Sequence, residues 1–102
     1  MRYGLSETDI NIILSVFANH PEVEKVVLFG SRAKGNYKPG SDIDLAIMGS
    51  NVVFDEYLTI TSQLDELNLP YRIDLINHGT IKDSNVLDHI RRVGITLYEK
   101  VS

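Results

Sequence analysis

The sequence contains no cysteine, only three prolines, and no apolar stretch of about 18 residues. The lack of cysteine rules out disulfide bonds and thiolate zinc sites, and it is neutral about the cellular compartment. Because there is also no hydrophobic segment of the signal-peptide type, we expect a soluble, cytoplasmic protein that does not enter a membrane. No charge run, repeat, low-complexity segment or Pro/Gly-rich linker divides the chain, so residues 1–102 are expected to form a single domain.

What the chain does have is a glycine-rich turn followed closely by a pair of carboxylates. The turn, Gly30–Gly35 (GSRAKG), comes directly after the apolar run Val26–Phe29. The carboxylates open a second apolar run, Asp42–Met48 (DIDLAIM). This pattern predicts a strand, a glycine turn, a loop and a second strand, with the two strands side by side.

The spacing of Asp42 and Asp44 predicts a metal site. Side chains at positions i and i+2 leave a strand on the same face, about 6.6 Å apart along it. Both carboxylates can therefore converge on a hard cation while Ile43 and Leu45 face the core. Mg²⁺ takes a few carboxylates in octahedral oxygen coordination and leaves its other positions to water and substrate phosphate. A nucleotide would complete such a site.

The glycine turn has the properties of a phosphate-binding segment. Gly30 allows backbone amides to approach an anion, and Ser31 can cap a short helix whose first amides favour negative charge. Residues 25–38 contain four basic side chains and no acidic one, although the net charge of the chain is −4. We therefore expect Gly30, Ser31, Arg32 and Lys34 to bind the nucleotide.

A Walker A loop is excluded by the residues that follow the turn. Gly30 and Gly35 have the G-x-x-x-x-G spacing of that motif. However, Asn36 and Tyr37 stand where Lys and Ser/Thr are required, and an Asp-x-Asp strand follows in place of a long helix. A P-loop ATPase is therefore not indicated.

A third carboxylate lies in the segment Tyr71–Ile76, which alternates polar and apolar residues as a half-buried strand does. The alternation places Arg72 and Asp74 on one face. If this strand lies beside that of Asp42 and Asp44, then Asp74 joins their cluster. There it could bind a second metal ion and accept the proton of an attacking hydroxyl, while Arg72 offsets the negative charge or contacts phosphate.

The remaining segments are predicted to form scaffold. A helix capped by Ser6 runs to His20-Pro21, a second covers about residues 54–67, and a third covers about 85–93. A strand-like segment at 95–98 follows Gly94. Helices interleaved with three strands predict a two-layer α+β sandwich. His20 is interpreted as a helix terminator, and His78 and His89 as surface residues without a metal-ligand partner.

The stretch Val26–Met48, with Asp74 beyond it, resembles the nucleotidyltransferase superfamily of DNA polymerase β and kanamycin nucleotidyltransferase. It is most similar to the minimal nucleotidyltransferases, or MNT proteins. These proteins carry Gly-Ser, about ten residues and Asp-x-Asp; here ten residues separate Gly30-Ser31 from Asp42. The family's GSRARG sequence is present with Lys34 in place of the second Arg.

This resemblance implies an α+β two-layer nucleotidyltransferase fold, a short mixed β-sheet packed against helices. It implies that Gly30 and Ser31 bind the triphosphate and that Asp42, Asp44 and Asp74 are catalytic carboxylates and metal ligands, for two Mg²⁺ ions when nucleotide is bound. MNT proteins are typically encoded beside an HEPN-domain partner. The implied function is an antitoxin enzyme, a protein adenylyltransferase that moves AMP from ATP to a tyrosine hydroxyl of an HEPN toxin.

Two other functions stay open at this point. The chain could be a non-catalytic antitoxin or regulatory module that masks an HEPN partner by contact. It could also transfer AMP to a small molecule or an RNA end, although the acidic net charge disfavours a broad nucleic-acid surface. Larger transferases of the superfamily add domains that hold the acceptor, so here a homo-oligomer mate or another protein is expected to supply that surface.

Overall fold

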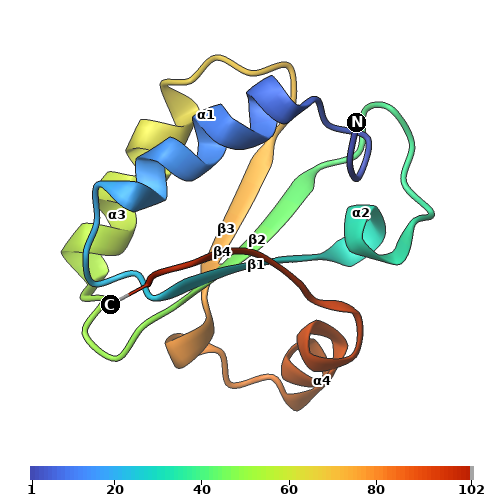
Figure 1. The fold of residues 1–102 in the computed structure, drawn as a ribbon. Helices are drawn as coiled ribbons and strands as arrows, with labels where there is room; N and C mark the ends of the chain where they lie inside the picture. Colours follow the sequence, from blue (N-terminus) through green and yellow to red (C-terminus); the bar gives the residue numbers. More distant parts are fainter. Residues whose placement is uncertain (102) are drawn as a thin grey trace.

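Four strands form one mixed sheet in the order β3-β2-β1-β4 (Figure 1). The strands are β1 (Lys25–Phe29), β2 (Ile43–Met48), β3 (Ile73–Asn77) and β4 (Ile95–Glu99). β1 is antiparallel to both β2 and β4, whereas β2 and β3 are parallel. The structure, a computed structural model, describes residues 1–101. The predicted α+β class with a short mixed sheet is confirmed, and the segment after Gly94 supplies the fourth strand.

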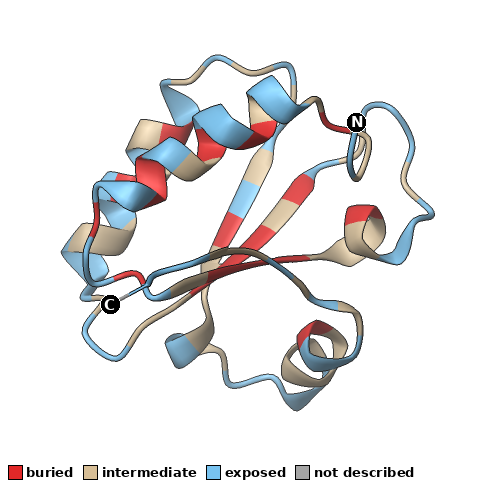
Figure 2. Ribbon diagram, in the orientation of Figure 1, coloured by how far each residue is buried: buried red, intermediate tan, exposed pale blue. Residues whose placement is uncertain are grey.

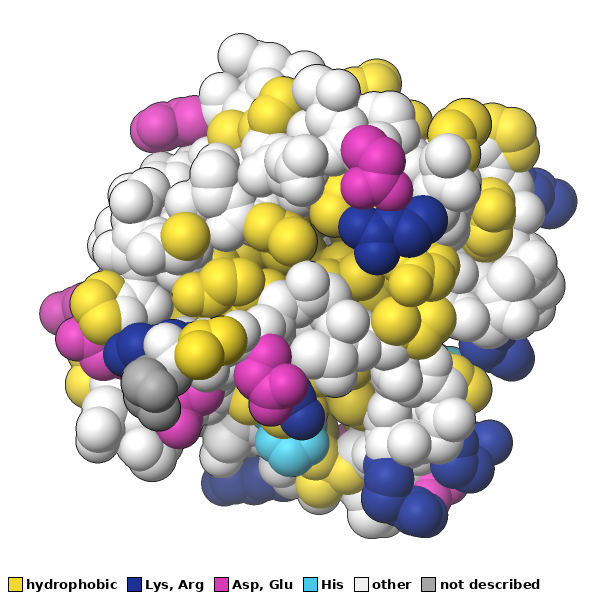
Figure 3. Space-filling view, viewed as in Figure 1, with side chains coloured by type: hydrophobic (Ala, Val, Ile, Leu, Met, Phe, Trp, Pro, Cys, Tyr) yellow, Lys and Arg dark blue, Asp and Glu magenta, His cyan; other side chains and the backbone are white. Residues whose placement is uncertain are grey.

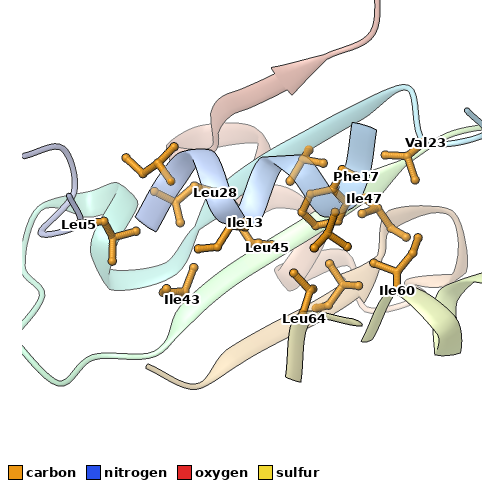
Figure 4. Close-up of a cluster of buried hydrophobic side chains, with 14 residues drawn as sticks. Leu5, Ile13, Phe17, Val23, Leu28, Ile43, Leu45, Ile47, Ile60 and Leu64 are labelled. Carbon is orange, nitrogen blue, oxygen red and sulfur yellow. The ribbon is translucent and has the colours of Figure 1, made fainter. Parts of the chain in front are cut away.

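Helices α1 (Glu7–Ala18) and α3 (Phe54–Asp65) cover one face of the sheet and enclose the main core (Figures 1 and 2). Ser6 caps α1, since its hydroxyl accepts a hydrogen bond from the Asp9 amide at 3.0 Å. Residues at helical spacing on both helices meet alternate residues of β2, and the labelled side chains in Figure 4 show this contact. The buried set includes Ile13, Phe17, Ile43, Leu45, Ile47, Ile60 and Leu64.

Helix α4 (Ser84–Val93) packs on the other face of the sheet, near the short helix α2 (Gly30–Lys34) and the 3₁₀ turn η1 (His78–Thr80). Its buried Ile90 forms a smaller apolar cluster with one residue each of β1 and β2. Because side chains alternate along a strand, burying the odd-numbered residues of β2 against α1 leaves Asp44 on the α4 face. No helix within residues 1–101 has the length and apolarity to span a membrane.

His20 links the end of α1 to α3, so its interpretation as a mere helix terminator is incomplete. The helix ends at Ala18, and the His20 ring is buried beyond it. Its nitrogens lie 3.1 Å from a Glu56 carboxylate oxygen and 2.8 Å from the Gln63 amide oxygen. Burial disfavours the charged imidazolium, but hydrogen bonds to Gln63 and Glu56 outweigh it and raise the pKa of His20 above 6.5.

We predict that the His20–Glu56 pair makes stability depend on pH. A raised imidazole pKa means that the stabilisation is fully present below pH 6.5 and is lost as pH rises through the folded-state value. In urea unfolding, wild type should exceed Glu56→Gln in stability by more at about pH 6 than at about pH 8. Glu66→Gln, at the exposed end of the same helix, is the control. A Glu56→Gln difference that is constant over this range would contradict the prediction.

Candidate nucleotide and metal site

The parallel pairing of β2 and β3 brings Asp44 and Asp74 directly opposite each other. Asp42 is the residue that leads into β2. The expectation that the strand of Asp74 lies beside the strand that Asp42 and Asp44 open is therefore confirmed, although the two strands are joined only through α3. Adjacent strands lie about 4.8 Å apart, so the backbones of Asp44 and Asp74 are held close by the sheet itself.

The charges of this cluster act on one another. Asp44 is half-buried, and burial, followed by the charges of Asp74 and then Asp42, raises the pKa of its carboxyl above 3.8. His89 acts in the opposite direction and lowers it. Asp42 and Asp74 are exposed to solvent. A cation placed among the three carboxylates would offset the repulsion that contributes to the raised pKa of Asp44.

The donor set fits a hard cation that is bound together with a nucleotide. All three groups are carboxylates, the ligands that Mg²⁺ prefers. Yet no three Asp, Glu or His side chains within residues 1–101 are arranged so that they would hold an ion by themselves. Phosphate oxygens and water would therefore have to supply the rest of the coordination shell, as is usual for Mg²⁺.

Gly30 lies in contact with the cluster at the end of β1. Its φ of +73° is in the left-handed region, and a Cβ at this position would lie 2.1 Å from Oδ2 of Asp44. Glycine is thus required both by the backbone and by the space that the carboxylate occupies. The Gly30 amide donates a hydrogen bond to Nε2 of His89 at 3.2 Å.

His89 is a site residue that the sequence interpretation missed. It is half-buried on α4, and its ring meets Phe29 edge-on at a centroid distance of 6.1 Å. The expectation that His89 is a surface residue is wrong, because α4 packs against α2 and brings the imidazole to the glycine turn. No motif spacing covers it, since it lies 59 positions after Gly30 in the sequence.

We predict that Gly30→Ala damages transfer far more than Ser31→Ala. The added methyl would force the Asp44 carboxylate aside at a strained φ, and a displacement of about 1 Å in an active site can cost about a hundredfold in rate. Ser31→Ala removes only a hydroxyl from the first turn of α2 and should have a modest effect. The measurements are kcat/KM for ATP and the melting temperature of each variant. Equally small effects would show that the turn is only a connector.

Arg32 does not take the place predicted for it. Its side chain is only 1% exposed, and its guanidinium donates to backbone carbonyls of Tyr3, Pro39 and Ser41. The expectation that Arg32 contacts the nucleotide is therefore corrected, because its donors point into the protein. Lys34, by contrast, is exposed on α2. The nucleotide contacts of Gly30, Ser31 and Lys34 remain predictions.

Arg72 and His78 lie at opposite ends of β3. Arg72 is exposed just before β3, and its carbonyl accepts a hydrogen bond from the Ile43 amide at 2.8 Å. His78 follows the opposite end of β3 and lines a cavity between α4 and the sheet, together with Lys25 and Arg91. Figure 3 shows Lys and Arg side chains gathered at the lower right, over the part of the molecule that contains α4 in Figure 1.

Comparisons with known proteins show what this chain is similar to in sequence and in fold. Residues 11–102 match the family model described as polymerase beta, nucleotidyltransferase. The Haemophilus influenzae protein described as "Probable protein adenylyltransferase MntA" is 35% identical over 75 residues, which cover 71% of this chain and 63% of that protein. The chain thus spans under two thirds of the length of this curated relative.

Solved structures show the same fold. A chain of a toxin–antitoxin complex with AMP-PNP superimposes with a TM-score of 0.74 at 20% identity, covering 90% of this chain and 74% of that one. A complex of a tri-AMPylated Shewanella oneidensis HEPN toxin with an MNT antitoxin gives a TM-score of 0.70 at 18% identity, covering 94% and 74%. Taken with the family match over residues 11–102, the sheet and its carboxylates identify this chain as a member of the polymerase beta nucleotidyltransferase family.

Proposed function

We propose that this protein is a Mg²⁺-dependent adenylyltransferase that moves AMP from ATP to a tyrosine hydroxyl of an HEPN toxin. The observation that carries the proposal is the register of β2 and β3, which pairs Asp44 with Asp74 on the face where Gly30 meets the Asp44 carboxylate. Membership in the nucleotidyltransferase family supports the reaction type.

In this mechanism the chain's own residues bind, orient and accept a proton. Asp42, Asp44 and Asp74 would hold the ions, whose chemistry is to neutralise the triphosphate and polarise the α-phosphate. The acceptor oxygen forms a bond to the α-phosphorus while the bond to pyrophosphate breaks in line. Asp74, whose side chain is exposed at the cluster, accepts the hydroxyl proton. Positioning and electrostatics account for most of the rate.

The descriptions of similar proteins support a protein as the acceptor. The Haemophilus relative is described as an adenylyltransferase acting on protein, and one structural neighbour is a complex that contains a tri-AMPylated HEPN toxin. Another was determined with AMP-PNP, which favours ATP as the donor. An HEPN-domain protein is therefore the proposed partner, and a second copy of this chain is the alternative source of an acceptor surface.

A non-catalytic antitoxin that only masks its partner is the second candidate. Such a protein gains nothing from a half-buried carboxylate placed beside two others, and the raised pKa of Asp44 shows that this arrangement is unfavourable without a ligand. The cluster therefore favours the enzyme. Transfer to a small molecule or to RNA has no specific observation in its favour.

The test is to incubate the protein with labelled ATP, Mg²⁺ and the product of the neighbouring gene, which the proposal expects to be an HEPN-domain protein, followed by intact mass measurement. We expect the HEPN protein to gain one or more adenylyl groups and to lose its toxic activity. A tyrosine-to-phenylalanine HEPN variant should gain none. Inhibition of the HEPN protein without any mass change, at stoichiometric ratios, would instead establish the masking antitoxin.

A further inference from the structure

The guanidinium of Arg32 binds backbone carbonyls from two segments of the chain. Nη1 donates to the Tyr3 carbonyl at 2.9 Å, and Nη2 donates to the Pro39 carbonyl at 3.3 Å. Nε and Nη2 both donate to the Ser41 carbonyl, at 3.1 and 2.8 Å. The charge also lies over the rings of Tyr37 and Tyr71, with centroid distances of 5.4 and 5.0 Å.

This arrangement is unusual because the buried cation has no carboxylate partner. Within the part of the chain that the structure describes, no Asp or Glu forms an ion pair with Arg32. A buried charge is costly unless hydrogen bonds satisfy it. Here carbonyl dipoles and two aromatic faces serve instead, so the side chain stabilises particular backbone segments.

The hydrogen bonds of Arg32 chiefly stabilise the turn that leads into β2. The Ser41 amide donates to the Lys38 carbonyl at 3.0 Å, and the Lys38 amide donates to the Ser41 hydroxyl at 2.8 Å. These two bonds close residues 38–41 into a tight turn. Arg32 then fixes this turn to helix α2 through the carbonyls of Pro39 and Ser41.

Asp42 lies between two anchored backbone groups. On one side the Ser41 carbonyl is held by Arg32, and on the other side the Ile43 amide donates to the Arg72 carbonyl at 2.8 Å. Asp42 itself is exposed and stands outside the strand, so the sheet does not fix it. The direction of its carboxylate therefore depends on these two anchors.

We propose that Arg32 is a positioning residue, which holds the backbone at Ser41 so that the Asp42 carboxylate is set for the metal ion beside Asp44. This inference rests on the proposed function, since it needs Asp42 to bind the metal. The planar guanidinium of Arg32 donates two hydrogen bonds to the Ser41 carbonyl and one each to two other carbonyls. A lysine ammonium is a single point charge and cannot reproduce this geometry. Arg32→Lys should therefore keep the positive charge and lose the paired hydrogen bonds to the Ser41 carbonyl.

The test measures, in the presence of ATP, how the melting temperature rises with Mg²⁺ concentration, for wild type and for Arg32→Lys. We expect the half-saturating Mg²⁺ concentration to rise by about tenfold or more, the usual effect of removing a residue that orients a metal ligand. ATP binding without Mg²⁺ should be unchanged, because no nucleotide contact is altered. The matched control is Ile60→Val, which weakens the core at its end away from Ile43 (Figure 4) and should leave the Mg²⁺ requirement unchanged.

A second variant guards against loss of folding in Arg32→Lys. Ser41→Gly removes the hydroxyl that closes the turn and loosens the backbone next to Asp42, and it should also raise the Mg²⁺ requirement. If either variant folds and keeps the wild-type Mg²⁺ requirement while Asp42→Asn loses the Mg²⁺ effect, the positioning role is wrong. If Asp42→Asn itself keeps the Mg²⁺ effect, the metal assignment fails, and with it the proposed function.

Discussion

Asp42→Asn and Asp44→Asn are each expected to abolish adenylyl transfer while leaving a folded protein. Each substitution keeps the side-chain volume but removes a charge that would bind the metal. Metal ions in such a role contribute several kcal/mol to stabilising the transition state, so the rate should fall by about three orders of magnitude or more. The measurement is initial-rate transfer of label from ATP to the HEPN partner, with circular dichroism to verify folding.

Asp65→Asn is the matched control, since this carboxylate is exposed at the end of α3, which covers the sheet face opposite to that of Asp44. It should transfer label at the wild-type rate. If Asp42→Asn or Asp44→Asn retained more than about a tenth of wild-type transfer, neither the metal assignment nor the proposed mechanism would stand.

Addition of Mg²⁺ and ATP is expected to raise the melting temperature of wild type, and Asp44→Asn is expected to stabilise the ligand-free protein. Ligand at one hundred times its dissociation constant stabilises the folded state by about 2.7 kcal/mol. Without ligand, burial and the charges of Asp74 and Asp42 raise the pKa of Asp44, so its ionisation opposes folding. Removing the charge relieves that opposition at the expense of function.

The raised pKa of Asp44 also predicts how the stability difference between Asp44→Asn and wild type depends on pH. A carboxyl whose pKa is raised on folding destabilises the protein at pH values above its folded-state pKa, and the effect disappears as pH falls toward 3.8. In EDTA, Asp44→Asn should therefore melt above wild type at neutral pH, with a gap that narrows on acidification. If wild type is indifferent to Mg²⁺-ATP and the variant melts below it in EDTA, Asp44 is a structural residue.

The sequence was sufficient for the elements whose chemistry is local. The strands at Val26–Phe29 and Asp42–Met48 were predictable because apolar runs and a glycine turn encode them directly. The position of Asp74 beside Asp44 was a conditional prediction, because strand alternation gives the face of a residue but not its neighbour. These two strands are joined through α3, and the sequence pattern does not specify on which side of β2 the chain returns.

The side chains that were misjudged depend on tertiary contacts. Arg32 lies in a basic, glycine-rich segment, where a phosphate contact was the simpler interpretation; only the folded loop shows its donors occupied by carbonyls. His89 and His20 lack motif partners, yet the packing of α4 and α3 gives each a polar partner distant in sequence. Local patterns cannot encode such pairs.

The long sequence separations within the site also have a consequence for folding. Asp44 and Asp74 are 30 residues apart in the pairing of β2 with β3, and Gly30 meets His89 across 59 residues. Contacts of this range form only after loop closure has been overcome, so they belong to the slow part of a folding reaction. Residues 30–44 carry the glycine turn, Asp42 and Asp44, but β3 and α4, which supply Asp74 and His89, come later in the chain. Under the proposed function, competence to bind nucleotide should therefore appear only when β3 and α4 have docked, and ATP binding would then report that these two elements are in place.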